Sequence, residues 1–227
     1  MKILALDTAT EACSAALLID GELHERFEIA PRAHARLVLP MLDGLLAEAG
    51  LKPAQLDAIA FGRGPGSFTG VRIAASVAQG IAFAADLPVL PVSTLAALAR
   101  DALQRTAVAH VFAAIDARMG EIYWAAYARD AQGEPRALNE EQVTPATAVS
   151  VPAGTDWFGI GSGWAMYETV LRAHFGAGLC AIDATALPRA GHIARLAAVD
   201  FVAGRALPAE QALPVYLRNQ VAQRPGG

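Results

Sequence analysis

The sequence predicts an α/β protein made of two similar halves, and three observations lead to this. Short apolar runs typical of strands alternate with longer runs of helical spacing. A glycine-rich stretch, R-G-P-G-S-F-T-G-V-R at residues 63–72, joins an apolar run to a run of small residues, as at a strand-to-helix turn. The order strand, aspartate, turn, strand occurs around Asp7 and again around Asp116. We therefore hypothesise a duplication of one unit.

The amino-acid composition restricts the classes of protein to which this chain can belong. The chain has 227 residues, of which 54% are apolar, so a substantial core is available. A net charge of -4 argues against a protein that binds nucleic acid unaided. Cys13 and Cys180 lie far apart in apolar runs and are expected to be reduced core residues. An acid follows the first five residues after Met1, and no uninterrupted apolar run has the length of a membrane helix, so we expect a cytoplasmic protein without a membrane partner.

The first half begins with three expected strands at residues 3–6, 14–19 and 23–29, which form a meander with a tight Asp20-Gly21 turn. Asp7 and Thr8 follow the first strand, where they either cap the turn or contribute to a site. A helix is expected over residues 34–49, restricted by Pro40 and ended by Gly50. His34, near its start, is expected to be a solvated or capping residue.

The glycine-rich stretch, residues 63–72, follows an expected strand at residues 56–61. Ser67 or Thr69 is expected to cap the helix that follows, over residues 71–85. Free amides at this helix start, flanked by Arg63 and Arg72, would attract an anion. Alternatively, the glycines only let the helix pack close to the sheet, and the residues themselves favour neither interpretation. The lysine of a P-loop is absent, which disfavours ordinary P-loop chemistry.

The pattern restarts beyond residues 104–106, which divides the chain into an N-terminal lobe, 1–104, and a C-terminal lobe, 105–227. Before this boundary, a strand is expected within residues 86–92 and a helix capped by Ser93 reaches about residue 103. After it, strands are expected at 110–115, 121–128 and 157–160, and helices at 164–175 and 193–202. Gly161 and Gly163 mark a second strand-to-helix turn, for which close packing is the favoured interpretation. Residues 135–156 give only a weak strand and loop signal.

Four stretches together resemble the bacterial TsaB (YeaZ) family, and they span nearly the whole chain. They are I-L-A-L-D-T-A-T-E-A-C-S at 3–14, G-P-G-S-F-T-G-V-R at 64–72, D-A-R-M-G-E-I-Y-W-A at 116–125 and P-V-Y-L-R at 214–218. The resemblance implies a two-lobed actin-like fold of the sugar-kinase and Hsp70 type, ribonuclease-H-like, with a mixed sheet flanked by helices in each lobe. It makes the last segment a candidate to pack back on the N-terminal lobe. It also implies a role in threonylcarbamoylation of adenosine 37 in tRNAs that read codons beginning with adenine.

In that system the transfer itself is attributed to a paralogue, TsaD, which carries a metal-binding His-x-x-x-His pair. Thr94 and Leu98 occupy the two corresponding positions here. Leucine cannot ligate a metal and threonine is a poor substitute for imidazole, so we expect no metal site and no catalytic residue of this chain's own. The sequence also lacks a His-Glu-x-x-His motif, a Gly-x-Ser-x-Gly elbow and a redox cysteine pair. The expectation is an accessory subunit.

The resemblance implies a partner interface on the helices at residues 34–49 and 71–85, which would pair with a TsaD-type subunit or, in isolation, with a second copy. The expected interface residues are Leu37, Val38, Met41, Leu45, Val71, Ala74, Ala75 and Ala78. On this basis Ala78→Arg should leave the monomer folded and abolish partner binding. A TsaE-type ATPase is the other expected partner, and tRNA is expected to be reached only through the complex.

A second set of residues is expected to contact a nucleotide, a phosphate or another subunit. This set comprises Asp7, Thr8, Arg63, Gly64, Gly66, Ser67, Arg72, Asp116, Arg118, Gly161 and Gly163. We expect no tightly bound cofactor, and ATP or ADP contact only in the assembled complex. The alternatives are an ATP-dependent kinase of the same fold, suggested by the two aspartates and two glycine turns, and a metalloprotease, against which the missing ligands argue.

Overall fold

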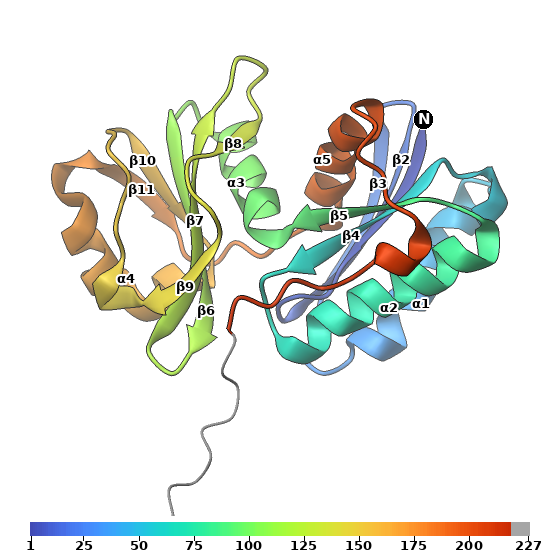
Figure 1. Ribbon diagram of the computed structural model, residues 1–227, viewed down its shortest axis with the longest axis horizontal. Coiled ribbons are helices and arrows are strands. Elements are labelled where there is room, and N and C mark those ends of the chain that lie inside the picture. The colour runs from blue at the N-terminus through green and yellow to red at the C-terminus, as the bar shows by residue number, and fades with distance from the viewer. Residues whose placement is uncertain (219–227) are drawn as a thin grey trace, which may run out of the picture.

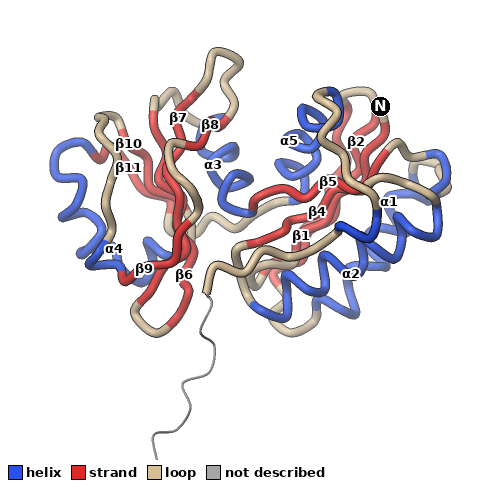
Figure 2. Tube along the Cα trace, viewed as in Figure 1, coloured by secondary structure: helices blue, strands red, loops and turns tan. Residues whose placement is uncertain are grey.

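The computed structural model describes residues 1–218 as two lobes that lie side by side (Figure 1). Each lobe consists of one mixed sheet with helices on both faces, as the coloured tube in Figure 2 shows. The predicted two-lobed α/β architecture is therefore confirmed.

The sheet of the N-terminal lobe has the strand order β3-β2-β1-β4-β5. Its strands are β1 (Lys2–Asp7), β2 (Ala12–Ile19), β3 (Glu22–Ile29), β4 (Ala58–Gly64) and β5 (Val89–Ser93). The first three strands form the predicted antiparallel meander, whereas β4 and β5 are parallel to β1. Asp20 and Gly21 have φ angles of 48° and 93°, as a tight hairpin turn requires.

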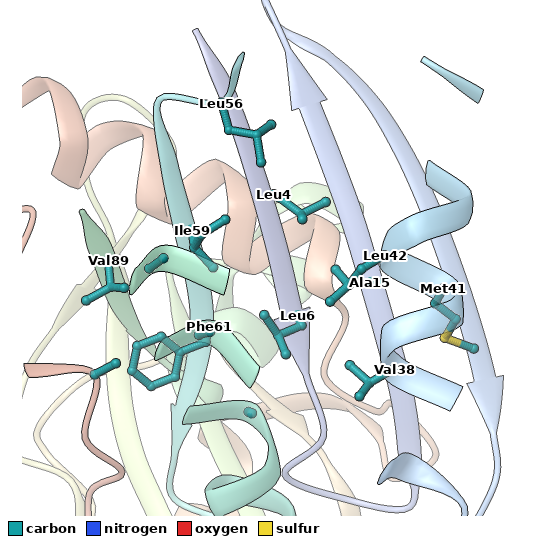
Figure 3. Close-up of a cluster of buried hydrophobic side chains, with 14 of the residues drawn as sticks. Leu4, Leu6, Ala15, Val38, Met41, Leu42, Leu56, Ile59, Phe61 and Val89 are labelled. Carbon is teal, nitrogen blue, oxygen red and sulfur yellow. The ribbon is translucent and has the colours of Figure 1, made fainter. Parts of the chain in front are cut away.

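The side chains of β1 point alternately to the two faces of the sheet, so the N-terminal core has two layers. Leu4 and Leu6 face α1 (His34–Glu48) and α2 (Phe68–Ala85), as Figure 3 shows for the side chains beneath α1. Ile3 and Ala5 face α5 (Ala190–Val202) on the opposite side of the sheet. Both faces of the sheet are thus covered, which explains why its strands are almost continuously apolar.

The sheet of the C-terminal lobe has the order β11-β10-β6-β7-β8, and β9 also pairs with β7. Its strands are β6 (His110–Arg118), β7 (Glu121–Arg129), β8 (Pro135–Ala137), β9 (Gln142–Pro145), β10 (Trp157–Ile160) and β11 (Leu179–Asp183). One face packs on α4 (Ser162–Phe175) through a cluster of Phe112, Trp124, Trp164 and Phe175, and the other packs on α3 (Thr94–Arg105). Four short 3-10 helices complete the described chain: η1 (Pro53–Gln55), η2 (Ala146–Ala148), η3 (Gly176–Gly178) and η4 (Ala209–Gln211).

The two sheets repeat one topology, which supports the duplication hypothesis. In both, the first two strands of the lobe are antiparallel, and the first is parallel to the strand that precedes the glycine turn. A helix then leads to a further parallel strand at the end of the sheet, β5 or β11. The repeat is incomplete in one place, because α1 separates the meander from β4, whereas only η2 lies between β9 and β10.

The predicted lobe boundary at residues 104–105 falls at the end of α3, a helix that packs against both lobes. Leu95 and Leu98 of α3 pack into the same core as Val111 of the C-terminal lobe, so the chain first crosses between the lobes at the β5–α3 junction. It crosses back before α5, whose Ile193 and Ala194 pack on the N-terminal sheet. Whereas α5 packs on the N-terminal sheet, α3 buries Leu95 and Leu98 in the C-terminal core and Ala97 in the N-terminal core.

Three local expectations also need correction. Cys180 is exposed on β11, so only Cys13 is a core residue. The strand β11 was not predicted from the sequence, because it is short and lies at the edge of the sheet. His34 is buried, with 8% of its surface exposed. The helix expected from residue 71 begins at Phe68, although Ser67 caps it as predicted, its Oγ accepting from the amide of Gly70 at 3.1 Å.

Helix α2 is, within residues 1–218, the one helix long and apolar enough to cross a membrane by length and composition. It carries Arg72, and Ala74, Ala78 and Ala82 on its inner face pack in the N-terminal core. This helix meets the length and composition criterion because it is apolar on its buried inner face and also largely apolar on its outer face.

Candidate functional site

A cavity of about 730 Å³ lies between the lobes. Its N-terminal wall is formed by the β1–β2 turn and the starts of α1 and α2, and its C-terminal wall by the β6–β7 turn and the start of α4. Residues 215–218 form a third wall. Of the residues expected to contact a nucleotide or phosphate, four line this cavity: Gly66, Ser67, Asp116 and Arg118.

Asp7 is sealed beneath the cavity wall. It is 1% exposed, and its carboxylate accepts from the amide of Ala9 at 2.8 Å and from the Thr94 hydroxyl at 3.1 Å. Burial raises the pKa of Asp7 from 3.8 to about 6, partly offset by those two hydrogen bonds. A Cβ at Gly62 would lie 1.8 Å from its Oδ2, so the carboxylate fills the space beside β4. Its role is to join the β1–β2 turn to α3.

The glycine-rich loop packs directly on the β1–β2 turn. A Cβ at Gly66 would lie 2.4 Å from the carbonyl oxygen of Ala9, and one at Gly70 would lie 1.9 Å from that of Thr8. The Thr8 hydroxyl, itself fully buried, donates to the carbonyl of Gly70 at 2.7 Å. These glycines permit close backbone approach, which is the packing alternative left open by the sequence.

The amides of Ser67 and Gly70 have partners within the protein, whereas the buried Nη1 of Arg72 has no hydrogen-bond partner among residues 1–218. The amide of Ser67 donates to the carbonyl of Ala9 at 2.7 Å, and that of Gly70 to the Ser67 side chain. The Arg63 guanidinium pairs with Glu141 of the C-terminal lobe at 2.9 Å, and the Arg72 guanidinium lies 3.2 Å from the centre of the Phe68 ring. The contacts of Ser67 and Arg63 thus join this loop to the β1–β2 turn and to the C-terminal lobe.

The equivalent turn in the C-terminal lobe also serves packing. A Cβ at Gly161 would lie 2.4 Å from the carbonyl oxygen of Ala114, and one at Gly163 would lie 2.8 Å from the Ala114 Cβ. Asp116, in contrast to Asp7, faces the cavity. Its carboxylate accepts from the amide of Arg118 at 2.9 Å and pairs with the Arg118 guanidinium at 3.1 Å.

The cavity is more apolar than the sequence analysis suggested. Apolar side chains from both lobes line it: Pro31, Pro65, Phe68, Val71, Ile115, Ala165, Met166, Val215 and Leu217. Charged groups stand among them, with Arg32 and Glu11 on the N-terminal side and Arg118, 83% exposed, opposite. His34 also lines the cavity, and its buried Nε2 has no hydrogen-bond partner among residues 1–218. The sequence analysis missed His34 and the 215–218 wall, although it had singled out P-V-Y-L-R as a family stretch.

Thr94 and Leu98, at the positions of the TsaD histidine pair, both point into the interior. Thr94 is fully buried on Asp7, and Leu98 packs in the core shared by α3 and the C-terminal sheet. Among residues 1–218, no group of three His, Cys, Asp or Glu side chains is arranged to hold a metal ion.

Most of the expected interface residues are core residues, which corrects the predicted partner surface. The structure buries Val38, Met41, Leu45, Val71, Ala74, Ala75 and Ala78, and half-buries Leu37. All but Val71 pack against the N-terminal sheet or its covering residues, so the buried ones among them are not available for a partner in this fold. The outward face of the same two helices carries other side chains: Ala35, Arg36, Leu39, Pro40, Asp43, Ala47 and Glu48 on α1, and Ser76, Gly80, Phe83 and Ala84 on α2.

Comparison with known proteins places this geometry in a family. Residues 22–225 match the family model of TsaD, described as tRNA N6-adenosine threonylcarbamoyltransferase. The chain is 42% identical over 228 residues to the tRNA threonylcarbamoyladenosine biosynthesis protein TsaB of Escherichia coli, covering 98% of this chain and 96% of the relative. This chain belongs to the TsaB family.

Two further comparisons agree with the family assignment. The TsaB protein of Haemophilus influenzae is 43% identical over 229 residues, covering 97% of this chain and 95% of the relative. The crystal structure of YeaZ from Pseudomonas aeruginosa superposes with a TM-score of 0.88 at 50% identity, covering 95% of this chain and 99% of that one. The actin-like fold implied by the sequence resemblance is therefore confirmed at the level of the whole chain.

Proposed function

We propose that this chain is a non-catalytic subunit that binds and activates a TsaD-type transferase in the threonylcarbamoylation of tRNA adenosine. The observation that carries the proposal is the outward face of α1 and α2. Leu39 is 50% exposed and Phe83 is 81% exposed on two helices that lie together over the N-terminal sheet (Figure 1). Such a face suits a helix-on-helix contact with another subunit.

The composition of α2 supports this interface. Ser76 and Gly80 lie one turn apart on its exposed side, and a Cβ at Gly80 would meet no atom within 4 Å. The packing of this chain therefore does not require a glycine at position 80. Glycine also lowers helix stability there by about 1 kcal/mol relative to alanine. A partner helix that packs closely against α2 would explain why position 80 is a glycine. The same face also suits a homodimer when the transferase is absent.

The sealed Asp7 supports a non-catalytic role. Its carboxylate accepts hydrogen bonds from Ala9 and Thr94, and the amide of Ser67 in the glycine-rich loop donates to the carbonyl oxygen of Ala9 in the β1–β2 turn. The isolated chain is accordingly proposed to bind ATP or ADP weakly, with nucleotide contact arising only in the assembled complex in the cytoplasm. Titration calorimetry of the purified chain with ATP tests this point, because tight binding with turnover would favour the kinase alternative.

The decisive experiment is reconstitution of threonylcarbamoyl transfer to tRNA from a TsaD-type subunit and a TsaE-type ATPase, with and without this chain. We expect transfer to require the chain. A transferase that is fully active without it would overturn the proposal.

The interface is tested separately by Gly80→Arg, which introduces a charged side chain on the exposed face of α2. We expect this variant to fold, to lose binding to the TsaD-type subunit in pull-down, and to remain monomeric in sedimentation. The matched control is Thr169→Arg, on an exposed position of α4 in the other lobe. Equal binding by the two variants would show that the interface lies elsewhere.

A further inference from the structure

Residues 213–218, here called the strap, run in extended form from η4 into the space between the lobes (Figure 1). The chain before the strap is firmly attached to the N-terminal lobe. Leu207 exchanges two backbone hydrogen bonds with Val89, at 2.7 and 2.8 Å, and Ala209 and Ala212 are buried against the core beneath α2. The strap therefore starts from a fixed point on one lobe.

The first half of the strap contacts the N-terminal lobe. The amide of Val215 donates to the carbonyl oxygen of Arg63 at 2.8 Å. The Tyr216 ring lies 6.0 Å from the Phe68 ring, and the Arg72 guanidinium lies over both, 3.2 Å from the Phe68 centroid and 4.9 Å from that of Tyr216. This stack holds the strap against the start of α2.

The end of the strap contacts the other lobe. The Arg218 guanidinium donates to the carbonyl oxygen of Ala117 at 3.0 Å and forms an ion pair with Glu121. Both acceptors belong to the β6–β7 hairpin. The Arg218 side chain is 22% exposed and that of Glu121 is 31% exposed, so the pair is partly shielded from water and interacts more strongly than a surface pair.

We propose that the strap is an intramolecular tie that fixes the separation of the two lobes and keeps the cavity between them closed. The chain crosses between the lobes twice elsewhere, at the β5–α3 junction and before α5, and two such crossings can act as a hinge. The strap is a third connection, placed at the cavity wall itself, and it opposes rotation about that hinge. Arg218 is its contact with the moving lobe. The proposal does not depend on the proposed function.

A distance measurement between the lobes tests the strap. Spin labels are placed on the exposed positions Ala35→Cys of α1 and Met119→Cys of the β6–β7 turn, in a Cys180→Ser background that leaves only the buried Cys13. The labelled full-length chain is diluted with unlabelled protein so that only intramolecular distances contribute to the pulsed EPR signal. We expect Arg218→Ala to lengthen the mean distance and broaden its distribution relative to the parent.

Two further variants separate a tie from a general loss of stability. Tyr216→Ala removes the stack on the N-terminal lobe at a position that is already 45% exposed, so it should fold, and it should broaden the distribution in the same way. Exchanging the charges, with Arg218→Glu combined with Glu121→Arg, should restore a narrower distribution than Glu121→Arg alone.

The matched control is Arg205→Ala, which removes an arginine that pairs with Asp200 within one lobe. This variant should leave the distribution unchanged. If Arg218→Ala and Tyr216→Ala both give the parental distribution while remaining folded, the Arg63–Glu141 pair and the two crossings suffice to hold the lobes, and the strap proposal is wrong.

Discussion

The two lobes share one topology but differ at the equivalent aspartates. Asp7 and Asp116 both follow the first strand of their lobe, yet Asp7 is sealed on Ala9 and Thr94, whereas Asp116 faces the interlobe cavity beside Arg118. Three neighbours cover Asp7: Thr94 of α3, Gly62 of β4 and the glycine-rich loop. In the N-terminal lobe this loop packs on the turn after Asp7 and closes it off. The equivalent positions therefore differ in degree: Asp7 is 1% exposed, whereas the Asp116 side chain is 10% exposed and lines the cavity.

The lobes also differ in the helices that cover their outer faces. In the N-terminal lobe the exposed side of α2 is formed largely by small and apolar residues such as Gly80 and Phe83, whereas α1 exposes Leu39 together with charged residues. The exposed side of α4 in the C-terminal lobe is also mixed, with Met166 beside Glu168, Thr169 and Arg172. The proposed docking surface therefore lies on the N-terminal lobe, centred on α2. The following predictions test this asymmetry, beginning with the largest expected effect.

Ala78→Arg should prevent folding of the N-terminal lobe, because Ala78 is fully buried between α2 and the sheet. An unpaired buried charge costs several kcal/mol, a large part of the stability of an ordinary domain. Circular dichroism and urea unfolding measure the effect, with Gly80→Arg, two residues away on the outer face, as the control. A folded Ala78→Arg protein would show that α2 can rotate or detach from the sheet.

Asp7→Asn should stabilise the protein at neutral pH, whereas Asp116→Asn should change stability by less than about 1 kcal/mol because its partner Arg118 is exposed. The pKa of Asp7 is higher in the folded state, about 6 against an ordinary 3.8, so the folded state binds this proton more tightly. Its contribution to stability is therefore lost as pH rises from about 4 to about 6, an effect of at most about 3 kcal/mol.

Urea unfolding between pH 4 and pH 8 checks the Asp7 prediction. The asparagine variant should lack the part of the pH dependence that belongs to Asp7 and should exceed the parent most clearly above pH 6. Identical pH profiles for the parent and the variant would mean that Asp7 is solvated in solution.

Gly70→Ala should destabilise the protein by about 1–3 kcal/mol, the cost of overpacking, and more than Gly163→Ala. A Cβ at Gly70 meets the backbone oxygen of Thr8 at 1.9 Å, whereas one at Gly163 first meets the Ala114 side chain at 2.8 Å. Thermal unfolding of the two variants ranks them. The reverse order would indicate that the N-terminal loop is the looser of the two turns.

Gly80→Ala should give the smallest effect, a gain of about 0.5–1 kcal/mol in the free energy of unfolding, since the added methyl meets no neighbour and alanine favours the helix. The same variant should weaken binding to the TsaD-type subunit if a partner helix packs on this position. A stability gain with unchanged binding would separate Gly80 from the interface.

Much of the fold could be predicted from the sequence because it depends on local signals. The Asp20-Gly21 turn, the Ser67 and Ser93 caps and the two glycine turns all follow from backbone preferences of a few adjacent residues. The weak strands in residues 135–145 and the edge strand β11 were missed, because short strands at the sheet margin carry little apolar alternation.

The sequence by itself determined the order of the main strands and helices, without β8, β9 and β11, and also the duplicated aspartate turns and the family. Only the tertiary structure decided which face of α2 is buried, because this helix is small and apolar on nearly all sides, so that its periodicity does not distinguish Ala78 from Gly80. The assignment of α3 and α5 to opposite lobes, the sealing of Asp7 and the course of the strap were decided there as well. Each depends on contacts between residues far apart in the chain, and no local preference specifies them.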